Sequence, residues 1–131
     1  MSHDPVADFI STLKNASAVN QRLVLVPHSN LKQAIAEKLV ASGFLKRVEV
    51  KSKLSKRQLE VEIAYGAKNE PVIMGVARVS KPSRRVYQAA RDARVFRQGY
   101  GEVIVSTSQG ILTLNEAKKL NIGGEILFKI W

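Results

Sequence analysis

The sequence has no cysteine among its 131 residues. A chain without cysteine forms no disulfide and offers no thiolate ligand to a metal ion. It also has no run of about 18 apolar residues, the length that a membrane-spanning helix needs. Its amino-terminal region lacks the basic stretch and apolar stretch of a secretory signal. We therefore expect an intracellular protein located in the cytoplasm.

Acidic residues are scarce, with 11 Asp and Glu against 21 Lys and Arg, and the formal net charge is +10. A folded domain this basic normally binds a polyanion, either nucleic acid or an anionic membrane surface. Membrane attachment would require a basic amphipathic helix or a lipidation motif, and the sequence shows neither. The apolar share of 45% is ordinary for a globular chain. Composition thus predicts a folded nucleic-acid-binding protein with no membrane partner.

Residues for catalysis are few. The three successive hydroxyls Ser106, Thr107 and Ser108 would need a general base to act as nucleophiles, and the only histidines are His3 and His28, both far away in the sequence. The chain has no phosphate-binding glycine loop, no metal-ligand cluster and no paired carboxylates. We predict that it is not an enzyme and that it has no catalytic residue, no metal site and no cofactor.

Two helices are predicted in the first half of the chain. Asp4 is suited to cap the first helix, with Pro5 at its first position, where the missing N–H does no harm. Either Ser29 or Asn30 caps the second helix, and Gly43 ends it. Strands are expected over residues 23–26, 44–50 and 58–64, the last two joined by a polar, basic hairpin loop over residues 51–57. These elements predict two helices packed on one face of a small sheet.

The polar stretch 66–71 resembles a domain boundary, and we predict an amino-terminal domain over residues 1–66 and a carboxyl-terminal domain over 67–131. The second half has mainly β character, with strands expected over 72–79, 84–88, 103–105 and 125–131. Thr113 with Glu116 forms a capping box for one short helix. The predicted fold class is α+β with two small domains, an amino-terminal α-β-α-β-β unit and a mainly β carboxyl-terminal unit.

Two stretches of the second half are suited to RNA. Residues 80–98 contain six basic residues and one acidic residue, with Tyr87 and Phe96 between them. Arginine forks bind phosphate and aromatic rings stack on bases, although such a run can also be a solvated face. The hydroxyls of residues 106–108 precede a predicted turn at 109–110, and they match the 2′-OH groups of an A-form minor groove. The alternative for Ser106 is a hydroxyl that bonds its own turn.

The pair Gly123–Gly124 predicts a tight turn, where missing Cβ atoms let backbone N–H groups approach phosphate or ribose closely. Glu125 follows this turn and is acidic where a basic groove is expected. We interpret it as a carboxylate that fixes the turn through backbone N–H groups or binds a base edge.

Four segments carry a family resemblance. Residues 101–118 read G-x-x-I-V-S-T-x-x-G-I-L-x-x-x-x-A-K, followed by G-G-E; the others are DPVADFISTLKNA from Asp4, VSKPSRRVY from Val79, and the aromatic end at Trp131. In this order they closely resemble the small-ribosomal-subunit protein eight family of the bacterial type, over nearly the whole chain. Ser83 stands where that family usually has Gly, which leaves the turn type open, and Leu112 stands where Met is common.

The resemblance implies a two-domain structural constituent of the small ribosomal subunit. It implies direct binding to a helix in the central domain of the small-subunit rRNA during early assembly, on cytoplasmic ribosomes, with organellar ribosomes left open. It implies small-subunit ribosomal protein five and other ribosomal proteins as neighbours, and the messenger RNA of the protein's own operon as a second ligand. The implied RNA-binding residues are Ser80, Lys81, Pro82, Arg84, Arg85, Tyr87, Ser106, Thr107, Ser108, Gln109, Gly124 and Glu125. The alternative is a free-standing RNA- or DNA-binding regulator that uses the same basic face.

Overall fold

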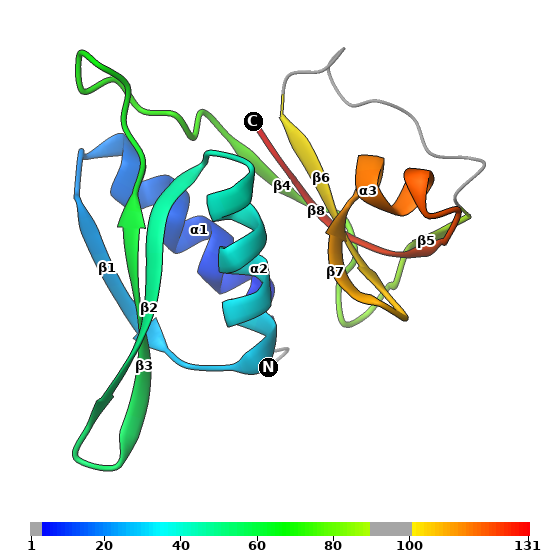
Figure 1. The fold of residues 1–131 in the computed structure, drawn as a ribbon, viewed down its shortest axis with the longest axis horizontal. Coiled ribbons are helices and arrows are strands. Elements are labelled where there is room, and N and C mark those ends of the chain that lie inside the picture. Colours follow the sequence, from blue (N-terminus) through cyan, green and yellow to red (C-terminus); the bar gives the residue numbers. More distant parts are fainter. Residues whose placement is uncertain (1–3, 90–100) are drawn as a thin grey trace. The chain divides into compact units, whose positions relative to one another are not determined.

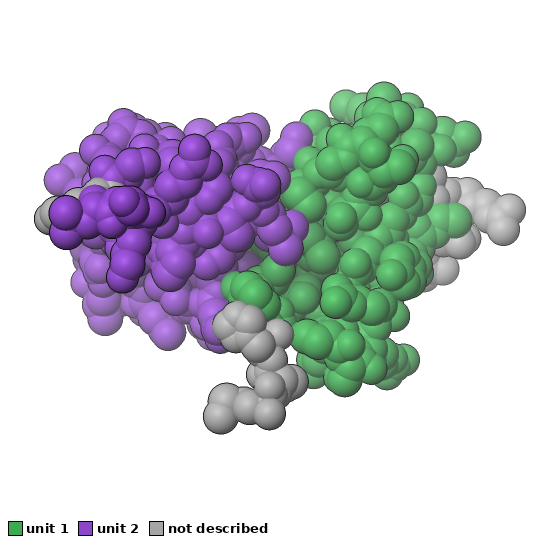
Figure 2. All heavy atoms as spheres, turned by 90° about the horizontal axis from the view of Figure 1, so that it is seen from below, with its two compact units in different colours: residues 1–7, 75–131 green, residues 8–74 purple. Residues whose placement is uncertain are grey.

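A computed structural model describes residues 4–89 and 101–131 (Figure 1). The chain forms two compact units (Figure 2). Unit 1 comprises residues 1–7 and 75–131, and unit 2 comprises residues 8–74. Each unit has its own antiparallel sheet. The predicted α+β fold class with two small units is confirmed.

Unit 2 contains a three-stranded sheet covered by two helices. Its elements are α1 (Pro5–Ala18, whose first residues belong to unit 1), β1 (Leu23–Pro27), α2 (Asn30–Ala41), β2 (Leu45–Lys53) and β3 (Lys56–Ile63). The strand order is β1-β3-β2, and both helices lie on the same side of the sheet (Figure 1). Leu59 and Val61 of β3 are fully buried, as are Leu13 of α1 and Leu39 of α2. These apolar side chains form the core of the unit.

The predicted helix caps are confirmed. The Ala7 N–H donates to Asp4 Oδ1 at 3.2 Å, which satisfies one of the free N–H groups at the start of α1. Ser29 caps α2 by accepting the Lys32 N–H at 3.1 Å. Gly43 follows the end of α2 with φ of +88°, a left-handed conformation that glycine adopts without strain.

The predicted loop over residues 51–57 is wrong. Strands β2 and β3 stay paired out to Lys53 opposite Lys56, and only Leu54 and Ser55 form the turn. Both turn residues have positive φ, +51° and +67°, as the mirror-image turns of two-residue hairpins require. The side chains of residues 51, 52 and 54–57 are exposed, and the segment lacks the apolar alternation by which strands are recognised.

Unit 1 contains the larger sheet. Its elements are β4 (Val76–Arg78), β5 (Tyr87–Gln88), β6 (Glu102–Thr107), β7 (Gly110–Thr113), α3 (Leu114–Lys119) and β8 (Gly124–Ile130). The order is β4-β8-β6-β7, and β5 also pairs with β8. Strand β4 pairs with the carboxyl end of β8 and β5 with its amino end. Val103, Val105, Ala117 and Ile126 form a buried cluster that joins α3 to the sheet.

Several predicted boundaries in unit 1 change. The capping box between Thr113 and Glu116 is confirmed, and it starts α3 at Leu114. The strand predicted over 72–79 is only three residues long, and the one predicted over 84–88 only two. Between them, the backbone bonds of residues 79–86 go to β8 and to a local turn instead of a continuous ladder. The part of the predicted basic run at 90–98 lies outside the described residues.

The compact units divide the chain between residues 74 and 75. Residues 66–70 form a tight turn in which the Gly66 N–H donates to the Glu70 carbonyl oxygen at 2.9 Å. The division into domains 1–66 and 67–131 stays a prediction about independent folding, which truncated chains would test.

Candidate nucleic-acid interface

The sheet of unit 1 brings together three separate segments of the sequence. In β5, Tyr87 is paired with Glu125 of β8, which is paired with Ser106 of β6, which is paired with Ile111 of β7. Directly opposed residues of antiparallel strands share one face of the sheet, with strands about 4.8 Å apart. These four side chains therefore form one lateral row, which we call the β5–β7 row. The sequence does not signal Ile111 as its fourth member.

Arg85, two residues before Tyr87, forms an ion pair with Glu125 of the β5–β7 row. Its Nη1 lies 3.1 Å from Oε2 of Glu125, and the Arg85 side chain is 52% exposed while that of Glu125 is 14% exposed. The hydrogen bond with Glu125 raises the pKa of the Arg85 guanidinium, and the attraction between the two charges adds to this effect. Glu125 therefore holds the Arg85 side chain in place. From the sequence, we had expected Glu125 to bond to backbone N–H groups of the turn or to a base edge.

Ser80 is part of the scaffold beneath the exposed residues. It is fully buried; its Oγ accepts the Val86 N–H at 2.8 Å and donates to the Val86 carbonyl oxygen at 3.2 Å. These bonds close the loop of residues 80–86. Ser80 therefore holds the loop that presents its neighbours, and its own side chain is not exposed in this structure.

The tip of this loop is a tight turn with exposed cations at both ends. Lys81 and Arg84 exchange backbone hydrogen bonds of 2.8 and 2.9 Å around Pro82 and Ser83. Ser83 does not have positive φ, which rules out a type II turn at this site. The position therefore needs no glycine, which explains why Ser is accommodated here. The side chains of residues 81–85 are all exposed.

The turn predicted over residues 109–110 lies one residue earlier, at Ser108 and Gln109, so the three successive hydroxyls do not all precede it. Ser106 and Thr107 belong to strand β6, and only Ser108 lies in the two-residue turn with Gln109. Thr107 Oγ1 donates to the Gly110 carbonyl oxygen at 2.9 Å and accepts the Gln109 N–H at 3.1 Å. Thr107 thus closes the hairpin. Ser108 and Gln109 are exposed at its tip, and Ser106 is half-buried in the β5–β7 row.

Gly124 is needed for strand contact. A Cβ atom at this position would collide with the Ser106 carbonyl oxygen and would lie 3.0 Å from the Thr107 methyl group. A Cβ on Gly123 would lie 2.6 Å from the Gln88 carbonyl oxygen. The two glycines therefore let β8 approach its neighbours on both sides, which places Glu125 between Tyr87 and Ser106.

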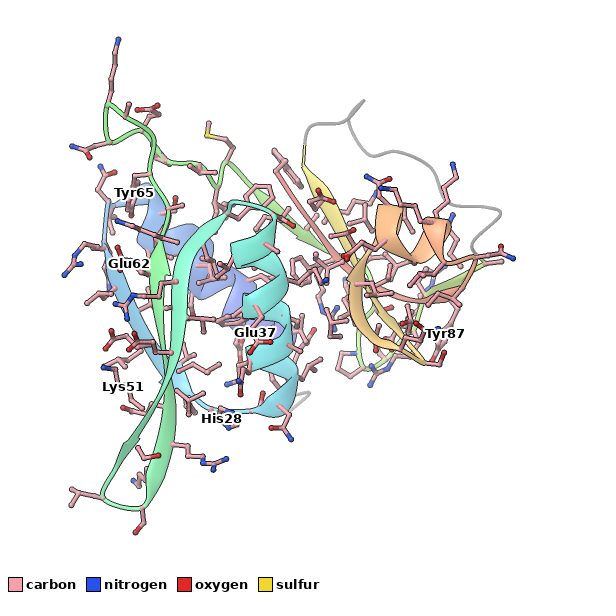
Figure 3. All side chains as sticks on the ribbon, viewed as in Figure 1. His28, Glu37, Lys51, Glu62, Tyr65 and Tyr87 are labelled. Carbon is pink, nitrogen blue, oxygen red and sulfur yellow. The ribbon has the colours of Figure 1, made fainter. Side chains whose placement is uncertain are left out.

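The surface that results carries cations at one side and uncharged polar groups at the other. Its exposed predicted residues are Lys81, Pro82, Arg84, Arg85, Tyr87, Ser108 and Gln109. Tyr87 is 71% exposed, and Figure 3 shows its side chain at the surface of the unit. Among the described residues, no group of His, Asp or Glu side chains could hold a metal ion.

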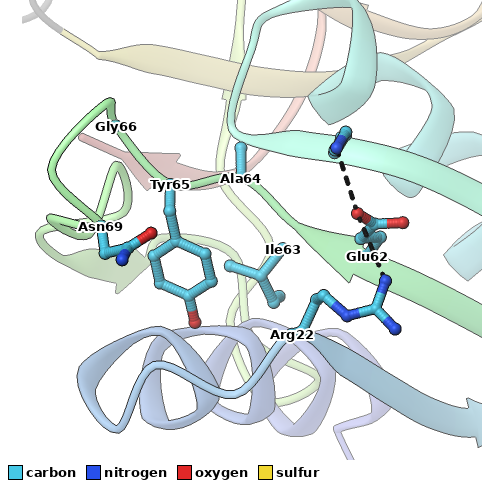
Figure 4. Close-up of a pocket in the computed structure, with 8 residues that line it drawn as sticks. Arg22, Glu62, Ile63, Ala64, Tyr65, Gly66 and Asn69 are labelled. Atoms are coloured by element: carbon cyan, nitrogen blue, oxygen red, sulfur yellow. Dashed lines mark ion pairs between the residues drawn. The ribbon is translucent and has the colours of Figure 1, made fainter.

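A separate hollow of about 370 Å³ lies in unit 2 (Figure 4). Glu62 forms ion pairs there with Lys46 at 3.5 Å and Arg22 at 3.9 Å, and with Arg47 at 3.3 Å. Burial raises the pKa of Glu62. The hydrogen bond from Arg47 and the positive charge of Lys46 lower the pKa by more than burial raises it, so the net shift is downward. The hollow contains none of the predicted site residues, and the sequence gives no signal of it beyond alternating charges.

Comparison with known protein families decides the family. The model of the family described as ribosomal protein S8 matches residues 4–131. The chain belongs to the ribosomal protein S8 family. The small ribosomal subunit protein uS8 of Streptococcus sanguinis is 41% identical over 128 residues, covering 98% of this chain and 97% of its own. The protein of the same name from Staphylococcus saprophyticus is 43% identical over 129 residues, covering 98% of each chain.

Family membership confirms the resemblance carried by the four sequence segments. The match also extends over residues of both compact units. Within the described part of the chain, no helix has the length and apolarity to cross a membrane.

Proposed function

We propose that this chain is a structural component of the small ribosomal subunit. In this proposal it binds a helix in the central domain of the small-subunit rRNA and promotes early assembly. Membership of the ribosomal protein S8 family supports the ribosomal role, as do relatives named small ribosomal subunit protein uS8. The family carries ribonucleoprotein and rRNA-binding functions, which agree with the net charge of +10.

The observation that carries the proposed binding surface is the β5–β7 row. Strand pairing places Tyr87, Glu125 and Ser106 side by side although they come from three distant segments. Exposed cations lie at residues 81, 84 and 85, just before β5 in the chain, and exposed uncharged groups lie at residues 108 and 109, in the turn between β6 and β7. A surface with phosphate binders next to neutral hydrogen-bonding groups suits the backbone and shallow minor groove of an A-form helix.

Each group has a role in this proposal. Lys81, Arg84 and Arg85 bind phosphates, since the ion pair with Glu125 orients Arg85 while leaving part of its five-donor fork free. Tyr87 stacks on a base or ribose.

The neutral groups read the minor groove. Ser106, Ser108 and Gln109 hydrogen-bond to 2′-OH groups and base edges. Ser80, Pro82, Thr107 and Gly124 position these groups through the loop, the turns and the close strand contact described above.

Further partners belong to the same proposal. Small-subunit ribosomal protein five and other ribosomal proteins are the neighbours, and the messenger RNA of the protein's own operon is a second RNA ligand that imitates the rRNA site. The resemblance of the sequence to the S8 family supports these partners, and it supports a location on cytoplasmic ribosomes.

Co-sedimentation with small ribosomal subunits in a gradient of rising salt tests the ribosomal role. We expect the chain to stay with the subunit at salt concentrations that release a general RNA-binding protein. Release together with such a control protein would contradict the ribosomal role and favour the free-standing RNA- or DNA-binding regulator, which would use the same exposed face.

A further inference from the structure

The β2–β3 hairpin extends beyond the sheet of unit 2. Strand β1 stops where Pro27 pairs with Gln58, whereas β2 and β3 continue through Lys51 opposite Gln58 to Lys53 opposite Lys56. Residues 51–57 therefore form a two-stranded ribbon past the end of β1, as Figure 1 shows. We call this segment the basic ribbon.

Charge on unit 2 is distributed unevenly. On the outer face of the sheet, acids neutralise the basic residues: Arg47 pairs with Glu60 and Glu62, each at 3.3 Å. Lys51 begins the basic ribbon on the side of the sheet away from the helices (Figure 3), and it still pairs with Glu49 at 3.2 Å. The sequence from residue 50 to residue 59, which includes Lys51, has four basic residues and no acidic one.

The cations at the end of the basic ribbon are uncompensated. Lys56 and Arg57 are exposed, and neither has an ion pair with any residue that the structure describes. No acidic residue within the ribbon itself is available to compensate these two charges.

The turn of the basic ribbon is unusual as well. Leu54 and Ser55 both have positive φ, a conformation that Asn and Gly adopt far more readily than Leu. The Leu54 side chain is 88% exposed. Residues 54–57 at the end of the ribbon are all exposed, and the only charged side chains among them are the basic ones of Lys56 and Arg57.

We propose that the basic ribbon is a second RNA-binding element, which contacts the phosphate backbone of RNA without reading its sequence. Charge complementarity selects a polyanion, and the narrow two-stranded form lets Lys56 and Arg57 reach phosphates. The inference takes RNA as the partner from the proposed function, but it needs neither the β5–β7 row nor recognition of a particular rRNA helix.

Paired salt titrations of the full chain test this element. The hairpin variant is Lys56→Gln with Arg57→Gln, and the control is Lys14→Gln with Lys68→Gln. The control cations lie in the same unit and are exposed, with no ion pair among the described residues. The probe is a short RNA duplex of unrelated sequence, titrated from about 50 to about 200 mM salt.

We expect the hairpin variant to flatten the plot of log affinity against log salt by roughly 1.5, about 0.7 to 0.9 for each lost phosphate contact. Lys56→Gln alone should give about half of this change, and the control should keep the wild-type slope. Equal flattening in both double variants would reduce the effect to net charge and overturn the proposal, as would an unchanged slope in the hairpin variant. If the hairpin variant keeps its RNA slope but loses binding to polyglutamate, the partner is an acidic protein and the RNA proposal is wrong.

A second probe separates this proposal from the proposed function. On the cognate rRNA helix, the hairpin variant should keep the wild-type preference for cognate over unrelated RNA. A wild-type chain that shows no preference for cognate RNA would contradict the proposed function. The slopes of log affinity against log salt on unrelated RNA would still test whether the basic ribbon binds phosphates.

Discussion

At the scale of single residues, three neighbouring hydroxyls have three different roles. Ser106 faces the β5–β7 row beside Glu125, and Ser108 is exposed at the hairpin tip. Thr107, between them, uses its hydroxyl within the turn. Chemically similar side chains are separated by strand alternation and by the turn, so their substitution should affect different properties.

Replacing Thr107 by Ala should destabilise the fold. Two hydrogen bonds of the β6–β7 turn are lost, and each contributes on the order of 1 kcal/mol. Thr107→Ser keeps the hydroxyl and should lose much less. Urea denaturation measures the free energy of unfolding of both variants, with Ser108→Ala as an exposed control expected to stay within about 0.5 kcal/mol of the wild type. Equal stability of Thr107→Ala and the wild type would contradict the role assigned to the turn.

Replacing Gly124 by Ala should destabilise the sheet where β8 meets β6. The added Cβ collides with the Ser106 carbonyl oxygen, a backbone atom that cannot move without disturbing the ladder. The cost should be in the range of about 1–3 kcal/mol, as for other overpacked sites. Urea denaturation again measures it, and Asn115→Ala on the exposed surface of α3 is the control. An equal change in both variants would show that the close strand contact is not required.

At the scale of elements, an ion pair joins the start of α1 to strand β4. Asp4 accepts the Ala7 N–H at the helix start, and its Oδ2 lies 2.9 Å from Nε of Arg78. Burial raises the pKa of the Asp4 carboxyl, but the hydrogen bonds from Arg78 and from the Ala7 N–H outweigh it. The net pKa lies below the ordinary value of 3.8.

This ion pair predicts a pH-dependent stability. A carboxyl whose pKa is lowered in the folded state contributes its full stabilisation of the fold at pH values above its unfolded-state pKa of about 3.8. The stabilisation is lost as the pH falls through the lower, folded-state pKa. Asp4→Asn keeps a good helix cap but removes the charge, so it should cost about 1–2 kcal/mol at pH 7.

The difference in unfolding free energy between wild type and Asp4→Asn should shrink as the pH is lowered below 3.8. Asp8→Asn, an exposed acid in the first turn of α1, is the control and should cost only about 0.3–1 kcal/mol. A difference for Asp4→Asn that does not vary with pH would contradict the role of the Arg78 pair.

How far elements can be predicted from sequence depends on whether their signals are local. The caps at Asp4, Ser29 and Thr113 are local, since each acts on an N–H group within three residues, and they predict the helix starts correctly. Strand ends depend on partners far away in the sequence. The basic ribbon therefore resembles a loop, and the short strand β4 resembles a longer one.

The candidate site shows the same division. The family motifs nominate its residues, and their binding role stays a prediction, but the burial of Ser80 is not visible in the motifs because it depends on the Val86 backbone. The pairing of Arg85 with Glu125 is also invisible in the sequence, because it spans 40 positions and depends on the register of β8.

At the scale of the whole molecule, basic charge is spread over both halves of the chain. Residues 1–66 have 10 basic and 6 acidic residues, a net charge of +4, and residues 67–131 have 11 and 5, a net charge of +6. Charge alone thus favours neither half strongly. Specific recognition should depend on the neutral groups of unit 1, while phosphate contacts supply affinity without sequence preference.

The most direct test of this account compares two double variants in salt titrations on the cognate rRNA helix and an unrelated duplex. Arg84→Ala with Arg85→Ala should flatten the salt dependence by roughly 0.7 to 0.9 for each lost phosphate contact, on both RNAs. Ser108→Ala with Gln109→Ala should leave the slope unchanged and narrow the affinity gap between the two RNAs, at about 1 kcal/mol for each lost contact. A wild-type slope in the arginine variant, or equal loss of both RNAs in the uncharged variant, would contradict the assignment of this face as the rRNA-binding surface.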